Sequence, residues 1–281
     1  MKVPELIDES RVKYKKNWKY TSEFYNDKGY YDCLSNRMDS NLRILEIGCG
    51  VGYSTISLSK KAKKLIAIDE NIFCINSTFQ RLNELNITTT KKQRGTINTR
   101  EGEDVLWYKM DYKNNFPIDE NKVHCIEGDI LSDKHLISHL ESLEKFDVIV
   151  CWMIGAHQLI LSKEDEQKKG RDNINRTPRM VFSYKVDVLK KVCEIGKNIL
   201  KKEGYLNIVE RVNSNAVSKM AKKEVLNQYK SLLDISNYKM DYENSELMHI
   251  ETQSKMPMSG EAGILKEPKI DLLIMDLHIV K

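Results

Sequence analysis

Short apolar runs alternate along the chain with segments in which apolar residues recur every three or four positions. The apolar runs, typical of buried strands, fall at residues 43–47, 64–68, 122–127, 146–153 and 205–210. The periodic segments predict helices at residues 53–61, 72–85, about 136–143, about 189–204 and about 215–233. Two further strand candidates lie at residues 247–252 and 270–280. This order predicts an α/β fold with a doubly wound, mostly parallel seven-stranded sheet, helices on both faces and a C-terminal antiparallel hairpin.

Residues 1–40 precede the first predicted strand and differ in composition from the rest. Seven aromatic residues are interleaved with lysines between Lys13 and Tyr31. They are Tyr14, Trp18, Tyr20, Phe24, Tyr25, Tyr30 and Tyr31. We expect a helical lid or cap at 1–40 that either packs on the main domain, 41–281, or lines a ligand pocket with its rings and hydroxyls.

Residues 86–121 interrupt the alternation between the second helix and the third strand. The stretch is polar, is basic at Lys91, Lys92 and Arg94, and contains one strand-like segment at 105–112. We interpret it as an insertion that contains some hairpin or helix, because a long structureless loop is uncommon inside a compact domain.

Composition restricts the class of protein without naming a function. Hydrophobic residues make up 41% and charged residues 31% of the 281, which is ordinary for a globular protein. The net charge of +4 argues against a dedicated nucleic-acid binder. Six cysteines without a C-x-x-C pair favour reduced, buried thiols and no metal site. Since no apolar run approaches about 18 residues, we expect a cytoplasmic protein that does not enter a membrane.

The most informative segment joins the first strand to the first helix. It reads Leu45-Glu46-Ile47-Gly48-Cys49-Gly50-Val51-Gly52, an apolar run followed by a carboxylate and three alternate glycines. Glycines allow a tight turn whose backbone can approach a ligand closely. The free N–H groups of the helix that follows are expected to bind anionic or polar ligand atoms.

Polar groups follow the other strands at the same edge of the predicted sheet, where open parallel sheets bind ligands. Asp69 and Glu70 follow the second strand, and Asp129 and Ile130 follow the third. Cys151 ends the fourth strand, His157 comes shortly after it, and Glu210 ends the fifth. Asp69 follows Gly48 at about the spacing at which an acidic residue binds a ribose. The pattern therefore predicts a nucleoside ligand.

The spacing of the glycines tests whether this nucleoside ligand is a dinucleotide. A dinucleotide fingerprint needs a glycine at the sixth position of the motif, which is Tyr53 here. The series Glu46, Gly48, Gly50 and Gly52 resembles the first motif of class I S-adenosylmethionine-dependent methyltransferases. Residues 127–130 and 146–149 resemble the adenine and fourth-strand motifs of that family. The resemblance covers about residues 40–212, excludes the insertion and leaves the N-terminal segment unassigned.

The resemblance implies a pose for S-adenosyl-L-methionine. The glycine turn with Gly48, Cys49, Gly50 and Gly52 would approach the methionine portion, and Glu46 and Cys151 are further candidate cofactor-binding residues. Asp69 would hold the ribose, and Glu70 is a further candidate cofactor-binding residue. Asp129 would accept a hydrogen bond from the adenine amine, and Ile130 would supply backbone contact and apolar cover. Structural alternatives stay open: a strand-end carboxylate satisfied by the backbone for Glu46, and helix caps for Asp69 and Asp129.

Methyl transfer from a sulfonium is an in-line displacement in which alignment and desolvation matter most. A hydroxyl or protonated amine acceptor also needs a base, and His157 is the best-placed candidate. Glu210 is a second candidate that could orient or deprotonate the acceptor. The alternatives are a helix-start or core histidine for His157 and an ion pair with Arg211 for Glu210.

The predicted reaction is methyl transfer to an oxygen or nitrogen of a small molecule, for example a secondary metabolite. An Asn or Asp-Pro-Pro-aromatic tetrad, which exocyclic-amine methyltransferases carry after the fourth strand, is replaced here by residues 151–154, Cys-Trp-Met-Ile. RNA and protein acceptors stay open as alternatives. So do a nucleoside-binding module without catalysis and a nicotinamide oxidoreductase. The sequence does not indicate an oligomeric state.

Overall fold

The computed structural model describes residues 3–94, 118, 122–155, 178–217, 220–233, 235, 237–251, 258–260, 263–265 and 269–280. In chain order, the elements of the first half are α1 (Val3–Asp27), α2 (Tyr30–Asn36), β1 (Leu42–Ile47), α3 (Tyr53–Ser59), β2 (Ala62–Asp69), α4 (Ile72–Glu84), β3 (Thr89–Lys92), β4 (Val123–Glu127), α5 (Lys134–Ser142) and β5 (Phe146–Trp152). The second half contains α7 (Pro178–Ile199), β6 (Leu200–Asn213), α8 (Ser214–Val217), α9 (Lys222–Leu233), β7 (Tyr238–His249), β8 (Met258–Gly260), β9 (Gly263–Leu265) and β10 (Ile270–Ile279).

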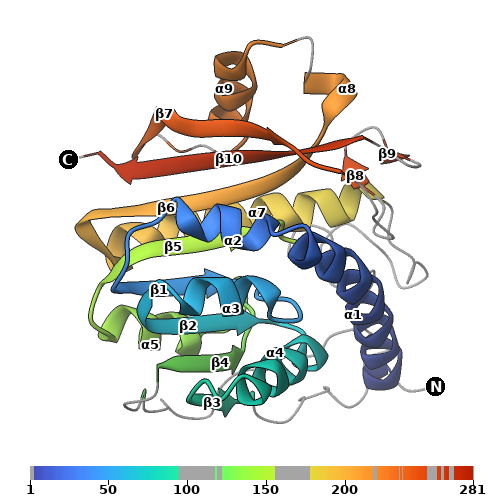
Figure 1. Ribbon diagram of the computed structural model, residues 1–281, viewed down its shortest axis with the longest axis vertical. Coiled ribbons are helices and arrows are strands. Elements are labelled where there is room, and N and C mark those ends of the chain that lie inside the picture. The colour runs from blue at the N-terminus through green and yellow to red at the C-terminus, as the bar shows by residue number, and fades with distance from the viewer. Residues whose placement is uncertain are drawn as a thin grey trace, which may run out of the picture.

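A single large sheet runs through the molecule in the order β3-β4-β2-β1-β5-β6-β10-β7 (Figure 1). The strands from β3 to β6 are parallel, and β10 pairs antiparallel with both β6 and β7. The predicted doubly wound sheet with an antiparallel C-terminal end is therefore confirmed. An eighth strand, β3, joins the edge from within the segment interpreted as an insertion, whereas the strand-like stretch at 105–112 lies outside the described residues.

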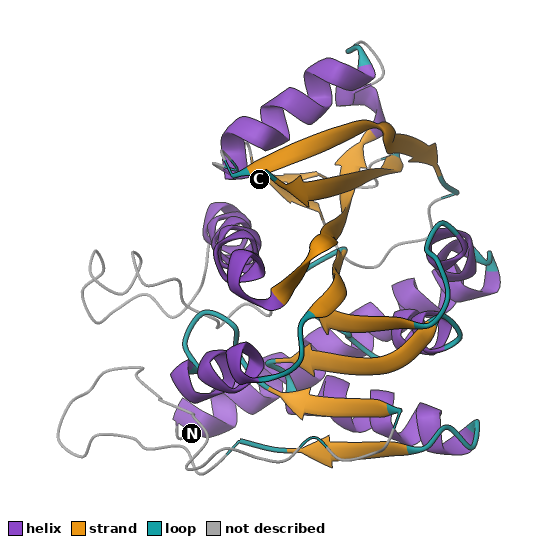
Figure 2. Cartoon of the chain, turned by 90° about the vertical axis from the view of Figure 1, so that its left-hand side faces the viewer, coloured by secondary structure: helices purple, strands orange, loops and turns teal. Residues whose placement is uncertain are grey.

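Helices cover both faces of this sheet (Figure 2). One apolar layer joins the sheet to α2, α3 and α4, and includes Leu58 and Ile75. The other joins it to α5, α7 and α9, and includes Leu136 and Leu189. Each such side chain, fully removed from water, contributes about 1.5–3 kcal/mol to folding. Both layers fix the strands, so the loops at the strand ends are held by a rigid frame.

Helix α1 lies beside the carboxyl ends of β2 and β4, to the right of the sheet in Figure 1. It contacts α2, α3 and α4. Helices are therefore present at 1–40, as expected. Within the described residues, no helix is long and apolar enough to cross a membrane.

Three predicted boundaries differ from the structure. The helix expected to end at Gly204 ends at Ile199, because Leu200 already pairs with Phe146 across β5 and β6. The helix expected at about 215–233 forms as two separate helices, α8 and α9. The strand predicted at 247–252 is Tyr238–His249 instead, since pairing with β10 extends through its polar residues and a register shift.

Candidate functional site

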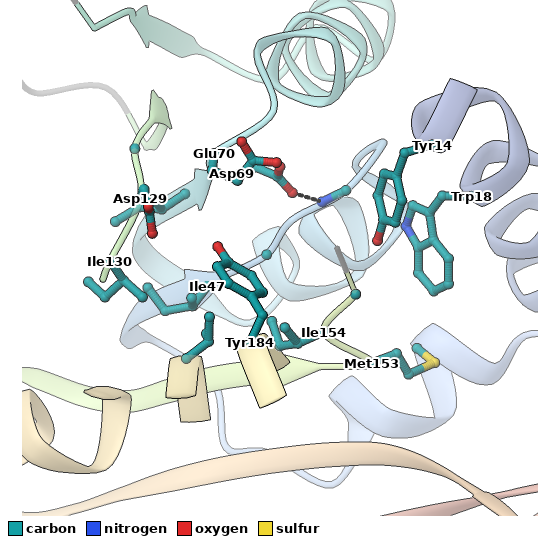
Figure 3. A pocket seen from close by; sticks show the side chains of 16 residues that line it. Tyr14, Trp18, Ile47, Asp69, Glu70, Asp129, Ile130, Met153, Ile154 and Tyr184 are labelled. Carbon is teal, nitrogen blue, oxygen red and sulfur yellow. Dashed lines mark hydrogen bonds between the residues drawn. The ribbon is translucent and has the colours of Figure 1, made fainter. Parts of the chain in front are cut away.

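A cavity lies where the carboxyl ends of β1, β2, β4 and β5 meet, with α1 and α7 beside them (Figure 3). Its lining residues are Tyr14, Trp18, Ile47, Gly48, Gly50, Ile68, Asp69, Glu70, Gly128, Asp129, Ile130, Met153, Ile154, Gly155, Tyr184 and Val188. Six of the predicted cofactor-binding residues are therefore brought together here: Gly48, Gly50, Asp69, Glu70, Asp129 and Ile130.

The glycine turn adopts a conformation that needs glycine at three positions. Gly48, Gly50 and Gly52 have φ of +81°, +56° and +93°, in the left-handed region that costs other residues about 1–2 kcal/mol. The N–H groups of Gly48 and Cys49 donate to the Ile68 carbonyl, and that of Gly52 donates to the Cys49 carbonyl. The Gly50 N–H donates to Asp69 Oδ2 at 2.9 Å. These four N–H groups are thus already bonded within the protein.

Asp69 ties the turn to the end of β2. Besides the bond from Gly50, its Oδ1 accepts from the N–H of Asn71 at 2.9 Å. Burial, with the neighbouring Glu70 charge as a smaller cause, raises the pKa of Asp69 to about 7. Each carboxylate oxygen has a second lone pair, so Asp69 can still accept hydrogen bonds from a ligand in the cavity. The cap on α4 is made by Asn71, whose side chain accepts from Phe73 N–H.

Asp129 combines a place in the cavity lining with a local turn role. Its Oδ1 accepts from the N–H of Leu131 and its Oδ2 from the hydroxyl of Ser132, at 2.9 and 2.7 Å. The turn role considered from the sequence is therefore real, and it fixes the direction of the carboxylate. A residue held in this way can offer its remaining lone pairs to an adenine amine.

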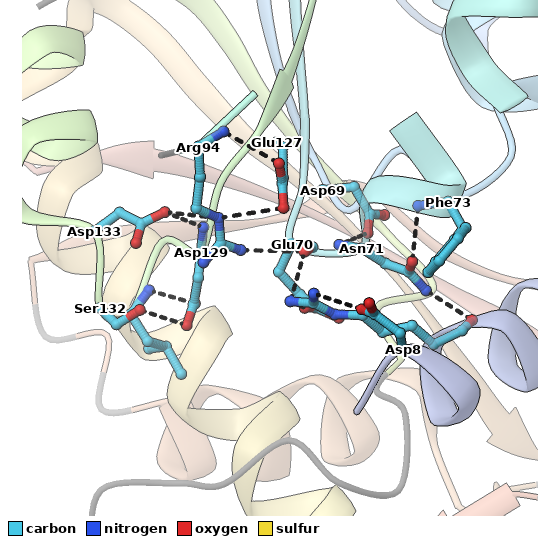
Figure 4. A network of polar contacts seen from close by, with 12 residues as sticks. Asp8, Asp69, Glu70, Asn71, Phe73, Arg94, Glu127, Asp129, Ser132 and Asp133 are labelled. Atoms are coloured by element: carbon cyan, nitrogen blue, oxygen red, sulfur yellow. Dashed lines mark hydrogen bonds and ion pairs between the residues drawn. The ribbon is translucent and has the colours of Figure 1, made fainter. Parts of the chain in front are cut away.

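Two buried arginines hold the outer rim of the cavity (Figure 4). From α1, Arg11 bonds the Glu70 carboxylate at 2.9 Å and the Glu70 carbonyl at 3.2 Å. From beyond β3, Arg94 bonds the same carbonyl at 3.1 Å and pairs with Asp133 at 3.3 Å. The Arg94 N–H also donates to Glu127. Sequence reasoning missed both arginines, because their partners are distant in the chain.

Four predicted cofactor residues do not line the cavity: Glu46, Cys49, Gly52 and Cys151. Glu46 accepts from the hydroxyls of Ser54 and Thr55, the latter at 2.7 Å, and burial raises its pKa to about 7. A Cβ on Gly52 would lie 2.8 Å from the Thr78 backbone. Cys49 and Cys151 are buried. Glu46 thus holds α3 against β1 with side-chain hydroxyls rather than with the backbone contacts considered from the sequence.

Aromatic residues from two helices cover the cavity. Tyr14 and Trp18 come from α1, and Tyr184 comes from α7 (Figure 3). Trp18 is 7% exposed. The sequence signal for the α1 residues was their aromatic density, and the lid interpretation agrees with their position. Nothing in the sequence marked Tyr184.

Of the two predicted catalytic residues, His157 and Glu210, the structure describes only Glu210. His157 lies outside the described residues. Glu210 is fully buried and does not line the cavity. Its ion pair is with Lys185 of α7, whereas Arg211 lies 5.8 Å from the Trp18 ring, so the pairing with Arg211 considered from the sequence is wrong. Consecutive residues of a strand point to opposite faces, which separates the two side chains. Burial, with Arg211 a smaller cause, lowers the pKa of Lys185 to about 7.

No protein-family model matches this chain, and no curated protein matches it. Solved structures with a similar arrangement include an rRNA methylase from Streptococcus thermophilus, 15% identical, covering 90% of this chain and 95% of that one, with a TM-score of 0.42. Precorrin-6y C5,15-methyltransferase from Geobacter metallireducens is 9% identical over 89% and 87%, with a TM-score of 0.44.

A third is the N-methyltransferase NodS from Bradyrhizobium japonicum, solved with S-adenosyl-L-homocysteine. It is 14% identical over 92% of this chain and 87% of that chain, with a TM-score of 0.44. At these identities and TM-scores, the likenesses carry no argument about the reaction, which rests on the residues of the site.

Proposed function

We propose that this protein is an S-adenosyl-L-methionine-dependent methyltransferase that transfers a methyl group to an oxygen or nitrogen of a small molecule. The charge of the cavity lining carries the proposal. Asp69, Glu70 and Asp129 line the cavity, and no lysine or arginine of the described residues does. An acidic lining favours a cationic sulfonium nucleoside over a dinucleotide, whose pyrophosphate is anionic.

The glycine turn supports the same choice. Dinucleotide sites present free backbone N–H groups to the pyrophosphate. Here the N–H groups of Gly48, Cys49, Gly50 and Gly52 donate to acceptors within the protein. The expectation of an anion site concerned the N–H groups of α3, which begins at Tyr53, and these four bonds do not test it.

The lining residues fit the pose implied by the sequence resemblance. Asp69 and Glu70 would accept from the ribose hydroxyls, and Asp129 from the adenine amine. Ile130, buried beside Ile47, would cover the ring. Glu46, Cys49, Gly52 and Cys151 would act through the shape of the turn rather than by contact. When bound, the cofactor supplies an electrophilic methyl group.

The protein's contribution is alignment of the two reactants and exclusion of water. Met153 and Ile154 follow β5 and line the cavity, so they are placed to orient an acceptor opposite the methyl donor. His157 stays a candidate base for an acceptor that must lose a proton. Glu210 is a candidate positioning residue, because it is fully buried and bound to Lys185 beside the cavity residue Tyr184.

A small-molecule acceptor is favoured by the cover that Tyr14 and Trp18 place over the cavity, which narrows access for a polymer. RNA and protein acceptors are the alternatives, and a nucleoside-binding module without catalysis is a further one.

Incubation with methyl-labelled S-adenosyl-L-methionine and a size-fractionated cell extract tests the proposal. We expect label in the low-molecular-weight fraction, and none with the Asp69→Ala variant. Label in RNA or protein would retain the methyltransferase and overturn the acceptor class. Donor binding with no labelled fraction would favour the binding module.

A further inference from the structure

Two hydrogen-bond donors on α1 lie against loops that line the cavity, Trp18 at the glycine turn and Tyr14 at Gly155, and neither has a hydrogen-bond partner among the described residues. A Cβ built on Gly50 would lie 2.3 Å from Trp18 Nε1, and one on Gly155 would lie 2.4 Å from the Tyr14 hydroxyl. Within the described residues, neither polar group makes a hydrogen bond to another residue, although Trp18 is 7% exposed. Each group can therefore still donate a hydrogen bond to a ligand in the cavity.

The chemistry of these donors restricts what they can bind. The indole N–H of Trp18 donates and cannot accept. Tyr14 is partly buried, and the loss of solvation raises the pKa of its phenol well above 10, so the hydroxyl keeps its proton at neutral pH. Both groups can therefore donate to an acceptor in the cavity.

A positive charge lies behind these two donors. The Arg211 guanidinium is 5.8 Å from the Trp18 ring and favours the ionised form of Tyr14, although the Asp69 carboxylate opposes this effect more strongly. The Asp129 carboxylate stands at the opposite side of the cavity, and the Asp69 carboxylate lies between, bonded to the Gly50 N–H (Figure 3). Charges of both signs therefore surround the cavity: carboxylates follow β2 and β4, and Arg211 lies beside Trp18 at the α1 end. A ligand with a nucleoside at one end and a carboxylate at the other matches this polarity.

We propose that Tyr14 and Trp18 bind the α-carboxylate of the methyl donor's methionine portion, so that α1 is part of the cofactor site. This inference rests on the proposed function and extends it, because nothing in the glycine motif assigns a group to that carboxylate. The helix is held in place by Arg11, whose contacts to Glu70 join α1 to the ribose side of the cavity.

Calorimetry with two ligands that differ only in the carboxylate tests the assignment. S-adenosyl-L-methionine carries it and decarboxylated S-adenosylmethionine does not. For Tyr14→Phe and Trp18→Phe, we expect binding of S-adenosyl-L-methionine to weaken by about tenfold or more, as for loss of a hydrogen bond to a charged group. Binding of the decarboxylated ligand should change less than about twofold.

Tyr20→Phe is the matched control, because Tyr20 lies on the same helix with its side chain 42% exposed. It should leave both affinities unchanged. Equal weakening of both ligands by Tyr14→Phe and Trp18→Phe, or no weakening of either, would overturn the inference and leave the proposed function standing. A wild-type protein that binds neither ligand would overturn both.

Discussion

The cavity has two sides that are built in different ways. The floor consists of the Gly48–Gly52 turn, Asp69 and Asp129, which follow parallel strands of one rigid sheet. The roof consists of Tyr14 and Trp18 on α1, a helix outside the sheet. Backbone hydrogen bonds fix the floor, whereas side-chain contacts of Arg11, Trp18 and the α1 helix face fix the roof. The floor can therefore be complete while the roof is displaced.

The largest expected effect is removal of the ion pair that holds the roof. Arg11→Met should lower the free energy of unfolding by about 3 kcal/mol, because it leaves the largely buried Glu70 carboxylate without its arginine. Chemical denaturation measures this change.

Lys28→Met is the control for that variant. Lys28 pairs with Glu251, and both side chains are exposed, at 38% and 71%. Its loss should cost less than about 1 kcal/mol. Equal costs for the two variants would show that Arg11 does not hold the roof.

The next effect is specific to the floor. Asp69→Ala should weaken donor binding by about 100-fold or more, since it removes two hydrogen-bond acceptors for the ribose and frees the Gly50 N–H. Calorimetry measures the affinity. Asp69→Asn keeps one acceptor oxygen and should lose less. Wild-type affinity in Asp69→Ala would remove the ribose assignment.

A smaller effect tests the contact between floor and roof. Gly50→Ala should cost about 1–2 kcal/mol of stability from its left-handed φ alone. It should cost more because the new Cβ would lie 2.3 Å from Trp18 Nε1. In the double variant with Trp18→Ala, that second part should disappear, giving a coupling energy of about 0.5–3 kcal/mol. If the losses of stability of the two single variants simply add in the double variant, Trp18 does not restrict the space at Gly50.

A separate test is a pH dependence within the floor. Burial raises the pKa values of Asp69 and Glu46 to about 7. The folded state therefore holds protons that the unfolded state has released above about pH 4, so the free energy of unfolding should fall between about pH 4 and about pH 7. Glu46→Gln should reduce this slope. A variant with the wild-type slope would remove Glu46 as a source of the effect.

The floor could be predicted from the sequence because its determinants are local. An apolar run, three alternate glycines and an acidic residue at the next strand end specify backbone positions that only a few residue types satisfy. The roof could not be predicted to the same degree. Trp18 meets Gly50, and Arg11 meets Glu70, only after α1 has packed on the sheet, and the aromatic density of α1 fitted ordinary packing equally well.

The hydrogen-bond partners of polar groups near the floor could not be predicted from the sequence either. The sequence placed Glu46 and Asp129 correctly at strand ends, yet their partners Ser54, Thr55 and Ser132 depend on how each turn closes. Glu210 was also predicted at a strand end, but β6 continues to Asn213, so Glu210 lies inside the strand. Its partner Lys185 became apparent only from the packing of α7 against β6.

Side-by-side calorimetric titration of S-adenosyl-L-homocysteine and NAD⁺ into the wild-type protein tests the central claim most directly. The acidic floor and the bonded N–H groups of the turn predict that S-adenosyl-L-homocysteine binds and NAD⁺ does not. Binding of NAD⁺ without binding of S-adenosyl-L-homocysteine would contradict the methyl-donor site.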